Sequence, residues 1–332
     1  WNQQHIQVKD FVKLLDTLDP EVQVVTVMVQ CYAGGYANIA FEEGDENSPA
    51  AAANRCGFFA TVHDRVAAGC TPDIDEANYH EYSTYFWQAI RGKSRLGDSI
   101  EQPDYDGDGR VSFEDAHAYA LIHSNTIDVS IKTSDRFLRA KSKLRDKDHE
   151  ELLSADSPYA ELLAIGRPAE RAVLEQLSAE LELPGDRRAE AAREAKKTLE
   201  ADKKKAEAER KKAEGECNAA REAIRKELLN RWPELANIWN PAAQDLLASD
   251  GAEMQQFIES HGEFSKFSVK HDEMERLNEQ KRDVERRMAK CDRVIRTLEN
   301  VALAANLAQV AEEQTIAQFQ RLREAEAGGL GE

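Results

Sequence analysis

The chain has 332 residues, of which 41% are hydrophobic and 32% are charged, enough for a buried core and for a long solvated helical part. Its formal net charge of −18 argues against nucleic acid or an anionic membrane as the main partner, because both would repel it. No apolar run approaches the ~18 residues that a membrane helix needs, so we expect no membrane span. The chain begins at Trp1 rather than Met, and we expect its true N-terminus to lie further upstream.

The first part of the chain, residues 1–144, has the pattern of an α/β domain. Apolar residues at 11, 12, 14 and 15, followed by Pro20, predict a short amphipathic helix over about 8–17. The β-branched run VQVVTVMV predicts a parallel strand, covered on both faces, over 22–29. The order of elements predicts part of a doubly wound sheet, in which ligands sit at the carboxyl ends of the strands. The following elements are a loop or short helix at 41–54, a buried strand at 56–62, a loop at 63–76 and a helix at 79–92.

The second part, residues 145–332, is rich in Ala, Glu, Lys, Arg and Leu and is expected to be all helical. Two apolar seams with heptad spacing predict an antiparallel coiled-coil hairpin with a small helical tip at 231–259. Such a hairpin can pair internally, dock a coiled-coil partner or form a homodimer, and its charge runs are most simply solvated faces. The earlier seam consists of Leu199, Ala206, Ala213, Cys217, Ala220, Ile224 and Leu228, and the later one of Leu277, Val284, Met288, Cys291, Ile295, Leu298 and Ala302, with Lys281 at the vacant place.

Cys31 directly follows the first predicted strand, in the stretch QCYAGGYAN. One interpretation is a nucleophile held at the end of a strand, with small residues at 33–35 that let the backbone turn beside it. The other is a small buried cysteine before a turn, because free cysteines are often buried. The local sequence leaves both interpretations open.

A strand that ends in Q-C-x-x-G-G resembles the catalytic stretch of the caspase-like clan of cysteine peptidases, which includes caspases, metacaspases, legumains and gingipains. The most similar pattern is the C-x-S-G turn of legumain-like and metacaspase-like members, in which Ala33 of this chain replaces the usual serine. The stretch from Asn54 to Ile90 also resembles the next strand, specificity loop and helix of bacterial legumain-like members. The resemblance covers roughly residues 1–140.

The resemblance implies a cysteine endopeptidase that cleaves a protein or peptide substrate through an acyl-enzyme on the Cys31 thiolate. In that arrangement the Cys31 backbone N–H faces the developing oxyanion, and Gly34 and Gly35 allow the turn. The family's second catalytic residue is a histidine in a His-Gly pair at the end of the neighbouring strand, upstream of the cysteine. His5 is the only histidine before Cys31, and Ile6 follows it, so the pair is not recognisable.

Three accounts of the missing histidine remain. An N-terminal fragment or upstream segment supplies it, or His63 substitutes for it, or the protein is inactive. The loop after the second strand is expected to wall the substrate pocket with His63, Asp64, Asp73 and Asp75, next to Arg65 and Glu76. Acidic residues there would select a basic side chain before the cut, whereas the alternative is an ordinary acidic surface loop.

The five cysteines lack paired CxxC spacing, which argues against a zinc site. Cys56 and Cys70 are candidates for one disulfide in an oxidising compartment. Cys31 as a redox thiol is a third interpretation, although no resolving cysteine lies near it in the sequence.

Residues 104–115, DYDGDGRVSFED, match the twelve-residue EF-hand loop, whose oxygen ligands suit a calcium ion. Gly109 falls at the sharp turn of position 6 and Val111 at the apolar position 8. Pro103 argues against a full entering helix, while 113–125 is expected to form the exiting helix. The loop favours an extracytoplasmic location. The predicted ligands are Asp104, Asp106, Asp108, the backbone carbonyl of Arg110, Ser112 and Asp115, the last in place of the usual glutamate.

The sequence therefore predicts a caspase-like, calcium-binding cysteine endopeptidase followed by a helical hairpin. The alternative is an inactive caspase-like scaffold that recruits protein partners through its coiled coil. A His-Gly pair after a hydrophobic strand upstream of Trp1 would discriminate between the two.

Overall fold

The computed structural model describes residues 6–52, 54–68 and 80–330. The chain divides into two compact units, one made of 1–197 with 286–332 and the other of 198–285. This division differs from the predicted boundary between residues 144 and 145. The difference arises because the helices that follow residue 144, and the last helix of the chain, complete the core around the sheet.

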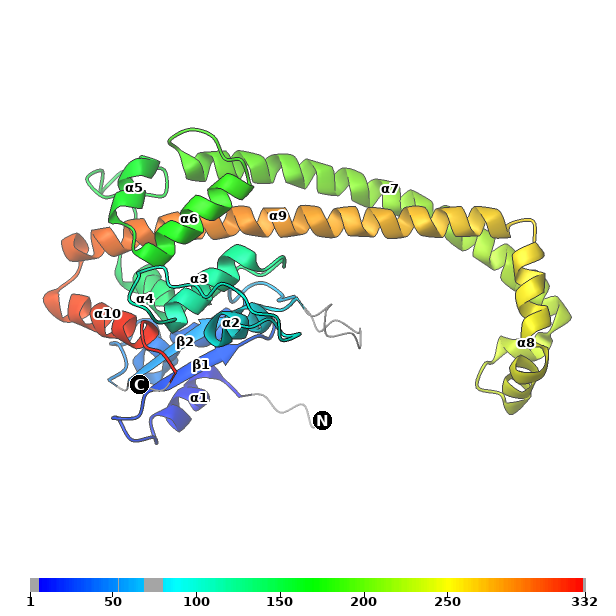
Figure 1. The fold of residues 1–332 in the computed structure, drawn as a ribbon, viewed down its shortest axis with the longest axis horizontal. Coiled ribbons are helices and arrows are strands. Elements are labelled where there is room, and N and C mark those ends of the chain that lie inside the picture. Colours follow the sequence, from blue (N-terminus) through cyan, green and yellow to red (C-terminus); the bar gives the residue numbers. More distant parts are fainter. Residues whose placement is uncertain (1–5, 53, 69–79, 331–332) are drawn as a thin grey trace. The chain divides into compact units, whose positions relative to one another are not determined.

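The first unit is built on a three-stranded sheet in the order β1-β2-β3 (Figure 1). Strands β1 (Val24–Met28) and β2 (Arg55–Phe59) are parallel, with Val24 opposite Arg55 and Met28 opposite Phe59. The two-residue strand β3 (Ile131–Lys132) pairs antiparallel with β2. The mixed α/β architecture and the two parallel strands confirm the sequence-based expectation in its coarse form. Among the described residues β1 pairs on one side only and is half-buried, so it forms an edge of the sheet rather than a strand covered on both faces.

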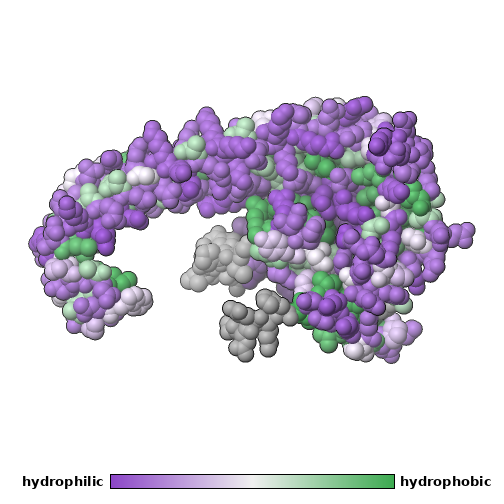
Figure 2. All heavy atoms as spheres, turned by 180° about the vertical axis from the view of Figure 1, so that it is seen from behind, coloured by the Kyte–Doolittle hydropathy of each residue, from purple (hydrophilic) through white to green (hydrophobic). Residues whose placement is uncertain are grey.

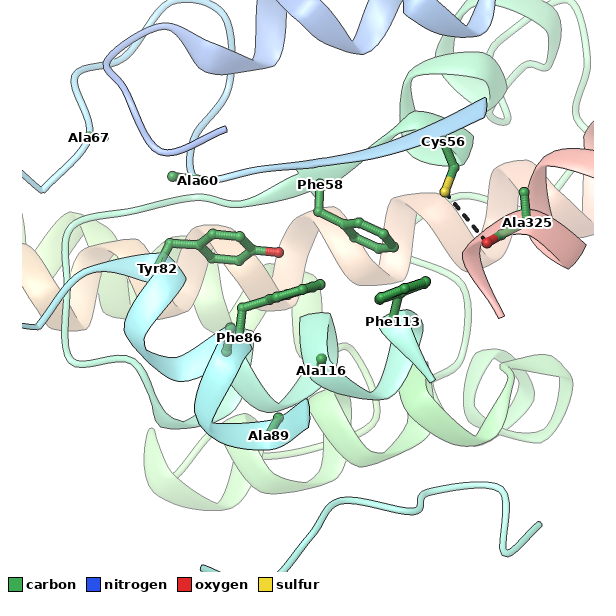
Figure 3. Packing of buried hydrophobic residues seen from close by; sticks show 11 residues of the cluster. Cys56, Phe58, Ala60, Ala67, Tyr82, Phe86, Ala89, Phe113, Ala116 and Ala325 are labelled. Atoms are coloured by element: carbon green, nitrogen blue, oxygen red, sulfur yellow. Dashed lines mark hydrogen bonds between the residues drawn. The ribbon is translucent and has the colours of Figure 1, made fainter. Parts of the chain in front are cut away.

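The pleat of β2 divides the core into two layers, because successive side chains of a strand point to opposite faces. Cys56 and Phe58 pack under helices α2 (Tyr82–Arg91) and α3 (Phe113–His123), as Figure 3 shows. Phe59 packs on the other face with Val12 and Ile39, which come from α1 (Val8–Leu15) and the 3-10 helix η1 (Ala33–Ala40). A second short 3-10 helix, η2, covers Glu42–Gly44.

A third hydrophobic cluster joins the last helix to the rest of this unit. Phe41 and Phe137 stack with their ring centroids 5.8 Å apart, and Phe319 stacks on Phe137 at 6.1 Å. Leu303 and Leu322 pack into the same cluster. The helices that contribute to it are α4 (Thr133–Lys141), the end of α9 (Phe264–Val310) and α10 (Glu313–Glu326). Helices α5 (Tyr159–Ile165) and α6 (Pro168–Glu180) follow α4 in the chain, and α6 packs against α3.

The second unit contains the distal parts of α7 (Arg188–Arg231) and α9, joined through η4 (Pro233–Ala236) and α8 (Pro241–Ser260). Three ion pairs join the two arms: Lys203 with Glu285, Glu207 with Lys281, and Glu216 with Lys270. The residue number of the α7 partner increases from pair to pair while that of the α9 partner decreases. The arms are therefore antiparallel, as predicted. Hydrophilic residues cover most of the visible face of this unit (Figure 2).

The earlier predicted seam lies within this unit, together with the first two residues of the later seam, whereas the rest of the later seam, from Met288 to Ala302, belongs to the first unit. Six of the seven earlier seam residues are buried, and Leu228 is half-buried. Leu277 and Val284 are buried opposite them. Lys281, at the vacant seam place, keeps its ammonium group 3.3 Å from Glu207 and 3.9 Å from Glu285. Within the described ranges, no helix combines the length and the apolar character needed to cross a membrane.

Candidate functional site

Cys31 lies three residues beyond the carboxyl end of β1 and carries the exposed thiol among the described cysteines. Cys56, Cys217 and Cys291 are buried. Burial raises the pKa of the Cys56 thiol and raises that of Cys291 to about 11, which makes both poor nucleophiles. The local structure therefore places one accessible thiol at a strand end, where the first interpretation of the sequence expects a nucleophile.

The backbone turns at Tyr32, which has a left-handed conformation with φ 61° and ψ 16°. We expected Gly34 and Gly35 to supply this turn, but neither has a positive φ. Gly34 is needed for a different reason. A Cβ atom at Gly34 would lie 2.7 Å from the carbonyl oxygen of Thr61 and 2.8 Å from the backbone nitrogen of His63. At Gly35 the nearest atom to such a Cβ is the Cβ of His63, at an ordinary 3.9 Å.

This close approach brings the segment after β2 alongside Cys31. The Tyr32 N–H donates to the carbonyl oxygen of Arg65 at 2.9 Å, and the Cys31 thiol donates to the carbonyl oxygen of Ala67 at 4.0 Å. The predicted pocket residues His63 and Asp64 lie at the start of this segment and are exposed. Asp73 and Asp75, and the disulfide candidate Cys70, lie outside the described residues.

Of the two predicted pocket residues that the structure describes, His63 is the one that approaches the glycine pair. Its backbone nitrogen packs against Gly34, and its Cβ faces Gly35. His117, in contrast, belongs to the core, where its Nδ1 lies 2.7 Å from the Tyr82 hydroxyl. Burial lowers the pKa of His117 to about 3, so it stays neutral and structural. His5 lies outside the described residues.

The predicted calcium loop brings three of its six ligands together. Carboxylate oxygens of Asp104, Asp106 and Asp108 all lie within 4.8 Å of one another, at an exposed position. Gly109 has φ 86°, which fits the sharp turn expected at position 6 of the loop. Arg110 pairs its guanidinium with Asp108 at 3.5 Å, while its carbonyl is the group predicted to bind.

The side chains of Ser112 and Asp115 form hydrogen bonds that cap the N-terminus of helix α3. They form a capping box, in which the Ser112 hydroxyl accepts from the Asp115 N–H at 3.0 Å and donates to the Asp115 carboxylate at 2.6 Å. Asp115 also accepts from the Tyr105 N–H at 3.3 Å, so it still faces the loop. Burial raises the pKa of Asp115. Residues 93–112 contain no helix, which agrees with the expected lack of an entering helix.

The start of α3, which directly follows the predicted calcium loop, and Cys31 lie at opposite ends of the hydrophobic cluster under α2 and α3. Phe113, the first residue of α3, donates its N–H to the carbonyl oxygen of Gly328 and lies near Cys56 and Ala325 (Figure 3). Ala60 and Ala67, which mark the Cys31 end, lie at the other end of the same cluster (Figure 3). A hollow of about 390 Å³ between the amino ends of β1 and β2 and helix α10 is likewise remote from Cys31.

Sequence reasoning missed the residues that hold the segment beside Cys31. Ala67 touches the thiol, and Asp128, in the stretch between α3 and β3, accepts a hydrogen bond from the Ala68 N–H at 2.7 Å. The one feature of the sequence that could have indicated Asp128 is the position of this aspartate inside the apolar stretch TIDVSI.

No family model, curated protein or solved structure matches this chain.

Proposed function

We propose that the chain is part of a caspase-like cysteine endopeptidase in which Cys31 is the nucleophile. The observation that carries the proposal is the exposed Cys31 thiol at the carboxyl end of a parallel strand, beside a neighbouring strand end to which Gly34 is tightly packed. Buried structural cysteines, such as Cys56 in the same sheet, have no such access to a substrate.

The proposed reaction proceeds in two steps. The Cys31 thiolate attacks the carbonyl carbon of the scissile peptide bond, and the amine leaves with a proton as the thioester forms. Water then hydrolyses the thioester and regenerates the thiol. Within the described residues the Cys31 N–H has no hydrogen-bond acceptor, which leaves it available for the oxyanion.

The proton acceptor is proposed to come from an upstream segment that adds a strand to the edge of β1 that no described residue pairs with. A parallel strand there would end beside Cys31, because the carboxyl ends of parallel strands meet at one edge of the sheet. The second account uses His63, which lies on the segment already packed against Gly34. If His63 is the base, His63→Ala should lower kcat by about 10²–10⁴-fold, whereas the upstream account predicts a small change.

The decisive experiment is labelling of Cys31 with a peptidyl electrophile. Wild-type protein should be modified at Cys31 faster by a peptidyl electrophile than by the same electrophile without a peptide, and Cys31→Ala should abolish the labelling. Equal rates for the two reagents would contradict a substrate-binding site at Cys31. Probes with Arg or Lys before the reactive group should react faster than probes with Asp or Asn if acidic residues line the pocket.

A calcium ion is proposed to bind at the Asp104–Asp106–Asp108 cluster, and the proximity of these three carboxylates supports it. The Arg110 carbonyl, Ser112 and Asp115 would complete the oxygen ligands. Such an ion would neutralise a dense negative charge at the amino end of α3 and stabilise the first unit of the chain.

The second candidate function is an inactive scaffold that binds protein partners. The observation that favours it is the tip of the second unit, where Ile238 and Trp239 are 59% and 81% exposed. No Lys or Arg occurs between residues 232 and 260, so the tip is acidic as well as apolar. A protein that contains the upstream segment, yet shows neither cleavage nor probe labelling at Cys31, would support the scaffold.

A further inference from the structure

The segment 65–68 forms one wall beside Cys31 and is held at both of its ends. At the Cys31 side, Arg65 and Ala67 accept the hydrogen bonds from the Tyr32 N–H and the Cys31 thiol. Ala67 is buried in the cluster under α2. The placement of these four residues therefore decides how much space surrounds the thiol.

Asp128 holds the far end of this segment. Its carboxylate accepts from the Ala68 N–H at 2.7 Å, and its own N–H donates to the Thr126 hydroxyl at 3.2 Å. The residue is 1% exposed. Burial raises the pKa of Asp128, while the hydrogen bond from Ala68 opposes that rise. A buried carboxylate bound to a backbone N–H is a strong and directional tie, because one partner is charged.

Arg293 of helix α9 fixes the stretch that carries Asp128. Its side chain is fully buried and donates to the carbonyl oxygens of Leu121, Ser124, Thr126 and Asp128 at 2.8–3.2 Å. Burial lowers the pKa of Arg293 to about 10, and the nearby Asp128 carboxylate opposes this shift. Two of these carbonyl groups, those of Leu121 and Ser124, lie at the end of α3, where a helix leaves carbonyl groups without helical partners.

Asp292, the neighbour of Arg293, reaches the other end of the same segment. Its carboxylate accepts from the Arg65 guanidinium at 2.7 Å and from the Lys196 ammonium of α7 at 2.7 Å. Two consecutive residues of α9 therefore act on the two ends of 65–68, one directly and one through Asp128.

We propose that Asp128, held in place by Arg293, is a positioning residue that sets the 65–68 wall against the Cys31 thiol. The proposal rests on Cys31 being the nucleophile. Asp128 touches neither the thiol nor a substrate, and it acts through Ala67 and Ala68. Loss of its carboxylate should let the wall relax, which opens the thiol to small reagents and spoils the shape that a peptide needs.

The test measures two rates at Cys31 in the full chain, by mass spectrometry of the modified peptide, well below the melting temperature. In Asp128→Ala, alkylation by iodoacetamide should become at least about threefold faster, because the thiol gains access and loses the neighbouring carbonyl oxygen. Labelling by the peptidyl electrophile should become slower by a similar factor. In Asp128→Asn, which keeps an acceptor of the same shape, both rates should stay near those of the wild type.

Two variants keep the test decisive. Asp128→Glu retains the charge but displaces the acceptor by one methylene group. It should change both labelling rates in the same direction as Asp128→Ala, and it provides the test if the alanine variant fails to fold. Glu326→Gln weakens the buried network that Glu326 forms with Lys132, Thr133 and Ser134, and it should lower stability without changing either rate. Unchanged iodoacetamide rates in Asp128→Ala and Asp128→Glu, or an equal change in Glu326→Gln, would overturn the proposal. A wild-type protein that ignores the peptidyl electrophile would count against the peptidase function, while the iodoacetamide rates would still test Asp128.

Discussion

Glu326, at the end of helix α10, makes two hydrogen bonds to Ser134 at the start of α4. The Ser134 N–H donates to one carboxylate oxygen at 2.7 Å and its hydroxyl donates to the other at 2.6 Å. Lys132 and Thr133 donate to the same carboxylate at 2.9 and 2.7 Å. Glu326 is fully buried, so the last helix is tied into the sheet by a carboxylate with all its partners in place.

Replacing Glu326 by Ala should destabilise the protein strongly. The Lys132 ammonium, which is buried, would lose one of its carboxylate partners, and the Thr133 and Ser134 groups would lose their acceptor. Removal of one partner from a buried ion pair costs about 3–5 kcal/mol. Urea unfolding should show this loss in Glu326→Ala. The exposed neighbour Glu324→Ala is the control and should change the free energy of unfolding by less than about 0.5 kcal/mol. Equal effects of the two substitutions would show that Glu326 contributes nothing special.

Gly34 and Gly35 should respond differently to the same substitution. In Gly34→Ala the new methyl group would meet the backbone of Thr61, Val62 and His63 at 2.7–2.8 Å, so one of the two strand ends has to move. We expect a loss of about 1–3 kcal/mol and weaker labelling of Cys31 by a peptidyl electrophile. Gly35→Ala meets only the Cβ of His63 at 3.9 Å and should keep both stability and labelling. Thermal unfolding and labelling rates of the two variants test this directly, and a tolerated Gly34→Ala would contradict the packing.

The parts of the fold that were predictable depend on local patterns. The β-branched run before Cys31 and the heptad seams each extend over enough residues to indicate a strand or a paired helix. Strand β3 was missed because two residues, Ile131 and Lys132, carry no recognisable period. Arg293 was missed because an arginine in a charged helix is normally solvated, and only the packing of α9 against the end of α3 makes it a buried donor.

In the candidate site, too, residues in local patterns were predictable from the sequence, whereas residues whose roles depend on tertiary contacts were not. Cys31 was recognisable because a cysteine after a hydrophobic run, followed by two glycines, is a short local pattern. The separate roles of Gly34 and Gly35 were not, since they depend on how closely the end of β2 approaches. Asp128 lies 97 positions after Cys31 in the sequence numbering, and nothing local indicates which backbone N–H its carboxylate accepts from.

Stability should fall as the pH drops below about 6.5, because His117 is buried as a neutral group. Its pKa is lowered to about 3 in the folded protein, so the unfolded chain binds the proton more readily between these pH values. The stabilisation is therefore fully present above pH 6.5 and is lost as the pH falls towards 3. Between pH 7 and pH 5 the loss from this one group should be about 2 kcal/mol.

Urea unfolding at a series of pH values tests this prediction. His117→Gln keeps a hydrogen-bonding partner for Tyr82 and should flatten the dependence between pH 7 and pH 5, although it is less stable than the wild type at pH 7. His271→Gln, at an exposed position of the second unit, should leave the dependence unchanged. An unaltered pH dependence in His117→Gln would contradict the burial of a neutral imidazole.

Calcium should raise the melting temperature of the first unit, and Asp106 is the sharpest residue with which to test it. A ligand at 100 times its Kd adds about 2.7 kcal/mol of stability. For a unit of this size, each kcal/mol raises the melting temperature by roughly 2–4 °C. Asp104 also accepts three backbone N–H groups within the loop, at 2.8–3.0 Å, so Asp104→Ala should lose the calcium shift and some stability without calcium. Asp106 accepts one such bond at 3.3 Å, so Asp106→Ala should lose the calcium shift with little other change. Thermal unfolding with calcium and with a chelator provides the measurement, and the exposed Glu101→Ala should keep the full shift. A wild-type melting temperature that does not respond to calcium would rule out the proposed ion.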